Sequence, residues 1–155
     1  MRRIAFFTIP LLLLLAAPLH AQYFGRNKPR YQNHEFQVTE TQHFTIYDYL
    51  KNPEKLKELA AAAELWYQMH QAVLQDTFKE KNPLVIYNDH AGFQQTNTIM
   101  GSVGVGTGGV TEGLRNRVVF PVAMTNQQTH HVLGHELVHA FQYHTILNGD
   151  STSMR

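Results

Sequence analysis

Cysteine is absent from this 155-residue chain, and neither charge sign is in large excess. Without cysteine the chain can have no disulfide framework, no thiolate zinc site, no cysteine nucleophile and no lipidated N-terminal cysteine. The formal net charge is only +1, which argues against a polyanion partner recognised through bulk charge. We therefore expect no nucleic-acid binding.

Histidine and apolar residues are well represented by contrast. The chain is 43% hydrophobic and 11% aromatic, which is enough for a globular core, and its length favours a single domain. Ten histidines are present, and five of them lie between His130 and His144. This uneven distribution directs attention to the C-terminal part of the chain.

The first 21 residues have the layout of a secretory signal peptide. Two arginines are followed by an apolar run and then by small residues around Ala21. The apolar run, Ile4 to Ala17, is interrupted by Thr8 and Pro10 and is too short to cross a bilayer comfortably. We predict cleavage after Ala21 and an exported product, periplasmic or secreted, without stable membrane insertion. An uncleaved N-terminal anchor is the alternative.

The remainder, residues 22–155, predicts an α+β domain. Residues 22–37 are expected to form an arm that docks through its aromatic residues, which are Tyr23, Phe24, Tyr31 and Phe36. Strands are predicted over 44–47 and 83–89, and a hairpin over 110–122 with its turn at Asn116. Two helices are predicted over 53–78 and 126–146. This order indicates a small mixed sheet packed against two long helices.

The first long helix has a clear start and one apolar face. Asn52 is a predicted N-cap and Pro53 stands at the first helical position. Residues that recur every three or four positions form the predicted core face: Leu56, Leu59, Ala60, Ala63, Tyr67, His70 and Leu74. We interpret His70 within this face as a packed core residue rather than a ligand.

A glycine-rich segment over 101–109 contains the string G-x-G-x-x-G at Gly104, Gly106 and Gly109. A dinucleotide site also needs a helix that opens at the third glycine, whereas Val110 begins a strand-like run. We therefore reject nucleotide binding. The glycines favour either a flexible loop over a cleft or a close approach to the hairpin.

The second long helix contains the motif H-E-x-x-H, from His135 to His139. At about 100° per residue the two imidazoles lie one turn apart on one face, with Glu136 on the flank. The opposite side is apolar, with Leu133, Leu137, Ala140 and Phe141, and Gly134 would let a neighbouring strand approach closely. Two histidines turned into a cleft are the arrangement that a catalytic zinc needs.

These residue types suggest their roles. His135 and His139 would bind Zn²⁺, and Glu136 would exchange a proton with the attacking water and the leaving amine. The alternative is a pair of surface histidines on an ordinary helix. His131 points to the same side, where it either contacts substrate, orients a ligand or is solvated; His130 and His144 are predicted to be structural.

A third ligand is missing from the motif's surroundings. A metzincin needs glycine at position 142 and histidine at position 145, where this chain has Gln142 and Thr145, so that class is excluded. No glutamate follows Glu136, and Asp150 is the only downstream carboxylate. Upstream, Glu112 is possible but would be an unusual topology for this motif.

Several separated segments resemble one family. They are YFGRNK, TQHFTIY, FQQTN with GVGTGGVTEGLRNRVVFP, and VLGHELVHAFQY. Together these resemble the peptidase MA-like (gluzincin) domain of exported bacterial proteins, which often precedes TolB-like β-propeller repeats. The resemblance implies a zincin-like N-terminal subdomain with zinc ligands at His135 and His139 and a catalytic Glu136.

The same resemblance implies a third ligand from a later helix, in a W-x-x-E-G-type segment, so we expect residues 22–155 to be a domain truncated at its C-terminus. By analogy, the hairpin around 110–119 would lie along the cleft and pair with an extended peptide substrate. The expected function is an exported zinc metallopeptidase, with a β-propeller as a possible C-terminal partner domain. The alternative is a noncatalytic binding or docking module of a propeller-bearing envelope protein.

Overall fold

The computed structural model describes Lys28 and residues 31–147. The predicted signal peptide, Tyr23 and Phe24 of the arm, and Asp150 lie outside the described residues. The elements follow one another as β1 (Gln37–Glu40), β2 (Phe44–Asp48), α2 (Pro53–Leu74), β3 (Asn82–Tyr87), α3 (His90–Gln94), β4 (Val110–Glu112), the short 3-10 turn η2 (Gly113–Arg115), β5 (Arg117–Pro121) and α4 (Asn126–Leu147).

The five strands form one mixed sheet in the order β1-β2-β3-β5-β4. The three inner strands are parallel, with Ile46 of β2 opposite Leu84 of β3 and Ile86 of β3 opposite Phe120 of β5. Both outer strands run antiparallel to their neighbours. The predicted α+β class and the mixed sheet are therefore confirmed.

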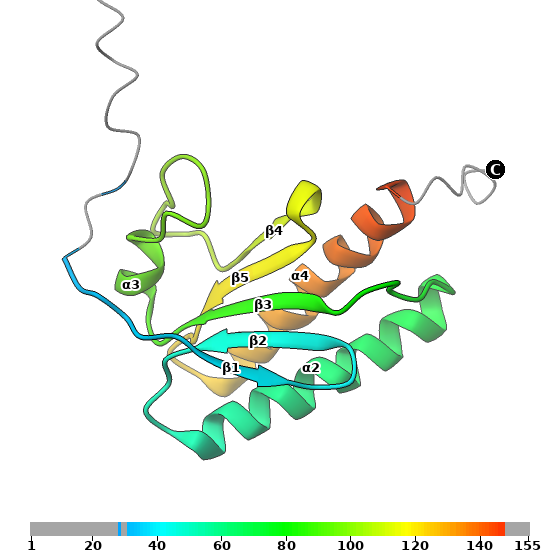
Figure 1. The fold of residues 1–155 in the computed structure, drawn as a ribbon, viewed down its shortest axis with the longest axis horizontal. Helices are drawn as coiled ribbons and strands as arrows, with labels where there is room; N and C mark the ends of the chain where they lie inside the picture. Colours follow the sequence, from blue (N-terminus) through cyan, green and yellow to red (C-terminus); the bar gives the residue numbers. More distant parts are fainter. Residues whose placement is uncertain (1–27, 29–30, 148–155) are drawn as a thin grey trace, which may run out of the picture.

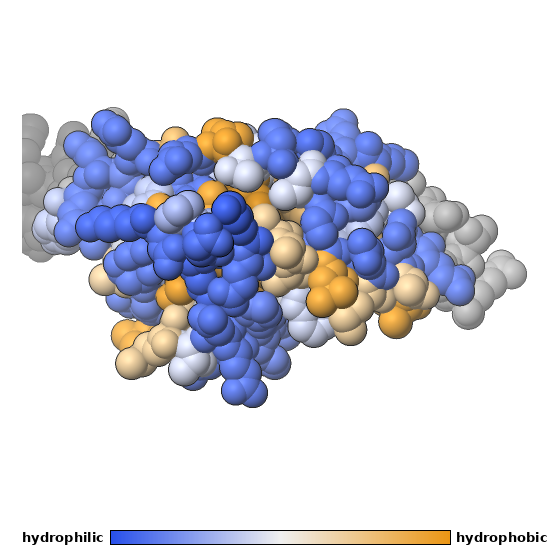
Figure 2. All heavy atoms as spheres, turned by 90° about the horizontal axis from the view of Figure 1, so that it is seen from below, coloured by the Kyte–Doolittle hydropathy of each residue, from blue (hydrophilic) through white to orange (hydrophobic). Residues whose placement is uncertain are grey.

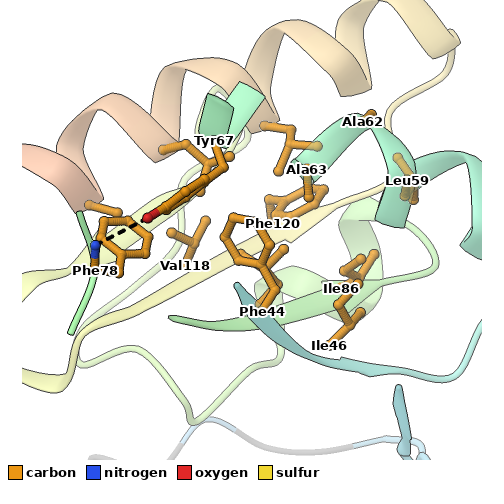
Figure 3. Close-up of a cluster of buried hydrophobic side chains, with 14 of the residues drawn as sticks. Phe44, Ile46, Leu59, Ala62, Ala63, Tyr67, Phe78, Ile86, Val118 and Phe120 are labelled. Atoms are coloured by element: carbon orange, nitrogen blue, oxygen red, sulfur yellow. Dashed lines mark hydrogen bonds between the residues drawn. The ribbon is translucent and has the colours of Figure 1, made fainter. Parts of the chain in front are cut away.

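Both long helices cover the same face of this sheet (Figure 1). Alternate residues of the inner strands point toward them, and Figure 3 shows how these side chains interlock with α2. The buried core contains Phe44, Ile46, Leu84, Ile86, Val118 and Phe120 from the strands, Leu59, Ala63 and Tyr67 from α2, and Leu133, Leu137, Ala140 and Phe141 from α4. The core thus fixes α4 firmly against the sheet.

Helix α2 begins as predicted but ends earlier. The Asn52 side chain accepts hydrogen bonds from the N–H groups of Glu54 and Lys55, which confirms the N-cap. The helix stops at Leu74 because Gln75 takes the left-handed conformation, with φ 53°. The predicted continuation to Phe78 is wrong: Phe78 folds back into the core, where its N–H donates to the Tyr67 hydroxyl at 3.2 Å (Figure 3).

The opposite face of the sheet carries a second, smaller apolar cluster under α3. It is built from Tyr87, Phe93, Val103 and Val119, with Phe36 packed against it. Docking of the arm through Phe36 is therefore confirmed, whereas Tyr31 is 80% exposed and does not dock through its ring. Its backbone N–H donates instead to Gln95 Oε1 at 3.0 Å.

Strand β1 and helix α3 do not follow from the sequence pattern. Strand β1 is an edge strand whose residues are mostly exposed, so it lacks the apolar alternation that would reveal it. Helix α3 has only five residues and is capped by Asp89, whose side chain accepts a hydrogen bond from the Gly92 N–H. Both elements depend on neighbours rather than on local pattern.

The predicted hairpin is present, with a shorter first strand than expected. Val110 pairs with Val119 and Glu112 with Arg117. Residues 113–115 form the 3-10 turn instead of continuing the strand, and Asn116 then takes a left-handed conformation with φ 46°. Asparagine tolerates that conformation better than most residues, which explains its place at the turn.

Apolar side chains remain exposed on the outer side of α2. Leu65 is 59% exposed and Val73 is 77% exposed, and Met69 and Leu74 are also exposed. The exposure of Leu74 departs from its predicted place in the core face. Seen from the α2 side, the molecule shows hydrophobic patches among hydrophilic residues (Figure 2).

Candidate metal centre

Helix α4 presents the H-E-x-x-H motif because its other side is anchored. Thr125 precedes the helix, and its hydroxyl oxygen accepts a hydrogen bond from the Gln128 N–H at 3.2 Å, which caps the first turn. The predicted apolar back is confirmed, since Leu133, Leu137, Ala140 and Phe141 are all at most 1% exposed. With that side in the core, the motif's histidines must face outward.

Gly134 lies against a helix rather than a strand, which corrects the sequence expectation. A Cβ at Gly134 would lie 2.7 Å from Cε2 of Trp66 on α2, so any side chain there would force the Trp66 ring or the helices to move. His70 of α2 donates from Nε2 to the Gly134 carbonyl at 2.9 Å and stacks on Trp66. His70 is packed against Trp66 as predicted, but it is only partly buried and does not belong to the buried core. Its hydrogen bond ties α2 to α4.

His135 and His139 approach each other on the outer face of α4. Their Nε2 atoms are 3.2 Å apart and their ring planes are nearly perpendicular, at 86°. Two nitrogens that bind one tetrahedral zinc at about 2.0–2.1 Å lie about 3.3–3.4 Å from each other. The Nε2–Nε2 distance is therefore close to the spacing that one zinc ion requires of two nitrogen ligands. A hydrogen bond between two imidazoles has a similar length, so the distance supports a metal site without requiring one.

The other ring nitrogen of His139 has a partner that favours metal binding. Nδ1 lies 2.9 Å from Oε1 of Gln142, one turn further along α4. Because an amide oxygen can only accept, Nδ1 carries the proton and Nε2 keeps its lone pair. Such outer contacts commonly orient histidine ligands toward a metal.

Glu136 is held on the flank of the motif, between α4 and β4. It is only 7% exposed, and its Oε2 accepts a hydrogen bond from the Thr111 hydroxyl at 2.7 Å. A Cβ at Gly109 would lie 2.8 Å from Cγ of Glu136, so this glycine lets the loop pass close to the helix. The glycine-rich segment therefore makes a close approach, but to α4 rather than to the hairpin.

Glu112 does not join the histidine pair. Adjacent residues of a strand point to opposite sides, so Thr111 faces α4 while Glu112 faces away. The Glu112 carboxylate accepts a hydrogen bond from Nε of Arg117, and that guanidinium also donates to the Thr98 carbonyl. Within the described part of the chain, no group of three or more histidine and carboxylate side chains is arranged to bind a metal. Sequence reasoning could not separate Glu112 from the motif, because the direction of its side chain depends on the register of β4.

The remaining histidines of α4 lie apart from the pair. His131 is exposed, with its ring centroid 6.4 Å from that of His135. His130 turns toward α2, where Nε2 lies 3.0 Å from a Glu58 carboxylate oxygen. The prediction that His130 is off the ligand face is confirmed.

His144 is a buried structural residue, as predicted. Its Nε2 accepts a hydrogen bond from the Lys79 N–H at 3.2 Å, so Nδ1 carries the proton and donates to Asp76 at 2.8 Å. Burial raises the pKa of Asp76, but hydrogen bonds from His144, Thr145 and Thr77 outweigh burial, so the pKa lies below its ordinary value. This contact joins the loop after α2 to the end of α4.

Two hollows of about 420 and 450 Å³ lie away from the motif. Both are lined by Phe36, Thr98, Arg115 and Arg117, and no residue of the trio His135, Glu136 and His139 lines either. They are therefore separate from the candidate metal centre.

Comparison with known proteins adds no relative. No family model, curated protein or solved structure matches the chain. None of the helices in the described ranges is long and apolar enough to cross a membrane. The interpretation of α4 therefore depends on its residues and their geometry, and the resemblance to peptidase MA-like domains stays a prediction.

Proposed function

We propose that this chain belongs to a zinc-dependent hydrolase. The observation that carries the proposal is the Nε2–Nε2 distance of 3.2 Å between His135 and His139, with the Glu136 carboxylate on their flank. Imidazole nitrogen suits zinc, and an amphipathic helix with one anchored side keeps the pair in place.

More particularly, we propose an exported zinc metallopeptidase of the gluzincin type. The H-E-x-x-H spacing and the resemblance to peptidase MA-like domains support this choice. A zinc ion bound by His135 and His139 would lower the pKa of a water and polarise a peptide carbonyl. The chain's own contribution is to orient the two imidazoles and to supply a base.

The contacts of Glu136 support its proposed role as this base. One carboxylate oxygen, Oε2, is occupied by Thr111, while Oε1 has no hydrogen-bond partner among the described residues. In the proposed reaction Oε1 accepts the proton of the attacking water and later donates it to the leaving amine. The carboxylate is thus restored at the end of each cycle.

Strand β4 supports a peptide as substrate. It is an outer strand of the sheet and runs beside α4, so its free edge offers backbone donors and acceptors next to Glu136. An extended peptide can add to such an edge as a further strand. A third zinc ligand is still needed, and we expect it from a carboxylate outside the described residues.

The second candidate is a noncatalytic docking module of a propeller-bearing envelope protein. The exposed apolar residues of α2 favour it, because they offer a surface for another segment. It predicts neither stoichiometric zinc nor cleavage, so the same measurements separate the two functions.

The decisive test compares the natural gene product with its Glu136→Gln variant. We expect near-stoichiometric zinc in both and loss of peptide cleavage by about 10²–10⁴-fold in the variant, which is the usual contribution of a general base. If the Glu136→Gln variant still cleaves peptides, Glu136 is not the base.

A further inference from the structure

Glu136 is enclosed by the first strand of the hairpin in a way that the motif alone does not require. The Thr111 hydroxyl lies 2.7 Å from Oε2 of Glu136 and 2.9 Å from the backbone carbonyl of the same residue. A hydroxyl has one proton, and the shorter distance assigns it mainly to the carboxylate. Thr111 thus touches both the side chain and the backbone of Glu136.

Gly109 makes this contact possible. A Cβ there would lie 2.8 Å from Cγ of Glu136 and 3.1 Å from Cγ1 of Val132, distances at which one of the neighbours must move. A Cβ at Gly108 would likewise lie 3.0 Å from Cγ2 of Val132. The backbone before β4 therefore runs directly against α4, and Thr111 reaches Glu136 two residues later.

We propose that Thr111 is a positioning residue for Glu136, with Gly109 providing the space that brings the two together. The proposal rests on the proposed function of Glu136 as a base. A glutamate side chain has several rotamers, and a base must stand within hydrogen-bond reach of the proton it takes. By occupying Oε2, Thr111 selects one rotamer and leaves Oε1 free for the proton.

A merely structural role for Thr111 is the competing explanation, since the same hydroxyl also connects β4 to α4. The two roles predict changes in different measured properties of a Thr111 variant. A structural role would lower stability and leave the remaining folded protein fully active. A positioning role lowers kcat in folded protein and leaves zinc affinity unchanged, because the Thr111 hydroxyl bonds to Glu136 and not to His135 or His139.

The experiment uses Thr111→Val, which keeps the shape and removes the hydroxyl, and Thr111→Ser, which keeps the hydroxyl. Thr45→Val is the matched control, because Thr45 is also a strand residue whose hydroxyl donates to a glutamate, Glu40, at 3.2 Å. Each variant of the natural gene product is measured for zinc affinity, for kcat and KM on a peptide, and for the Glu136 rotamer in a crystal structure. Gly109→Ala, measured in the same way, provides a second disruption.

We expect Thr111→Val to lower kcat about tenfold or more, the value of one hydrogen bond to a charged group, with KM and zinc affinity within about twofold. Its Glu136 side chain should leave the rotamer seen here. Thr111→Ser should restore both properties, Gly109→Ala should resemble Thr111→Val, and Thr45→Val should match the unmodified protein.

An unchanged Glu136 rotamer in Thr111→Val would overturn the proposal, and so would an unchanged kcat in a protein that cleaves peptides. If Thr111→Val does not fold, Gly109→Ala decides by the same criteria, with Thr111→Ser as the control that keeps the hydroxyl. If the unmodified protein binds zinc but cleaves nothing, the proposed function fails, and the rotamer comparison still decides whether Thr111 positions Glu136.

Discussion

Helix α4 places its histidines in two opposite environments. Near its C-terminal end, His144 is 7% exposed and both ring nitrogens have partners, Asp76 and the Lys79 N–H. Earlier in the helix, His135 and His139 lie on the outer face with their Nε2 atoms turned toward each other. The same helix therefore carries one buried histidine bound to the loop after α2 and two histidines whose Nε2 atoms face each other on its outer side.

The contrast separates stability from function. A buried imidazole with two hydrogen bonds contributes to the fold, and removing one partner leaves a polar group unsatisfied. The facing Nε2 atoms lie outside the core, so a ligand that binds them as neutral imidazoles would leave the core undisturbed. Substitutions around His144 should thus change stability alone, and those at the pair should change zinc binding alone.

Removal of one motif histidine should have the greatest effect. In His139→Ala we expect zinc affinity to fall about 100-fold or more, because loss of a ligand should cost more than loss of a residue that only hydrogen-bonds to a ligand. The free energy of unfolding should change by less than about 0.5 kcal/mol. Competition with a metal chelator and thermal unfolding of the metal-free protein would measure these quantities. His130→Ala on the same helix is the control, and a similar loss of zinc affinity there would contradict the separation.

Removal of the carboxylate beside His144 should destabilise the fold. Asp76→Ala leaves the Nδ1 proton of His144 and the Thr145 hydroxyl without this acceptor, so we expect a loss of about 2 kcal/mol. Denaturant unfolding would measure it. Glu58→Ala removes the carboxylate from the more exposed pair with His130 and should cost less than about 1 kcal/mol. Equal losses of stability in Asp76→Ala and Glu58→Ala would contradict the distinction between the buried pair and the more exposed pair.

Acid should weaken the contribution of Asp76. Since the pKa of this carboxyl is lower in the folded protein, its stabilisation is fully present above the unfolded-state pKa of about 3.9. It is lost as the pH falls through the lower folded-state pKa. The difference in melting temperature between the unmodified protein and Asp76→Ala should therefore narrow below about pH 4. A difference that stays constant down to about pH 2 would contradict this assignment.

Substitution of His131 should have the smallest effect on zinc affinity, and it tests whether the metal site extends beyond His135 and His139. It is exposed and lies one turn before His135, and the distance between the two ring centroids is 6.4 Å. We expect His131→Ala to change zinc affinity by less than about twofold, since the ring lies outside the facing Nε2 pair. Calorimetric titration with zinc would decide, and a tenfold loss would make His131 a ligand.

Local patterns predict most of the regular elements. The apolar period indicates helix α4, and Asn52 with Pro53 marks the start of α2. The predicted end of α2 lies four residues too late, because Phe78 continues the apolar period although its backbone has left the helix. Strand β1 is not predicted, because an exposed edge strand has little apolar alternation.

The site is predictable in part. The spacing of His135 and His139 places them on one face of any α-helix, and the structure brings their Nε2 atoms together. The contact between Thr111 and Glu136 is not foreseeable, because it joins residues 25 positions apart. The sequence marks Gly109 only as part of a glycine-rich string, whereas its close approach to α4 sets it apart from Gly106, which has open space around it.

The sequence by itself determined the helix, the side of it that is buried and the residue types that can bind zinc. These follow from a period of 3.6 residues and from the chemistry of imidazole and carboxylate. Only the tertiary structure decided which partners those residues meet. It turned Glu112 toward Arg117, buried His144 against Asp76 and set Thr111 on Glu136. Such contacts depend on strand register and on the packing of distant elements, which no local pattern encodes.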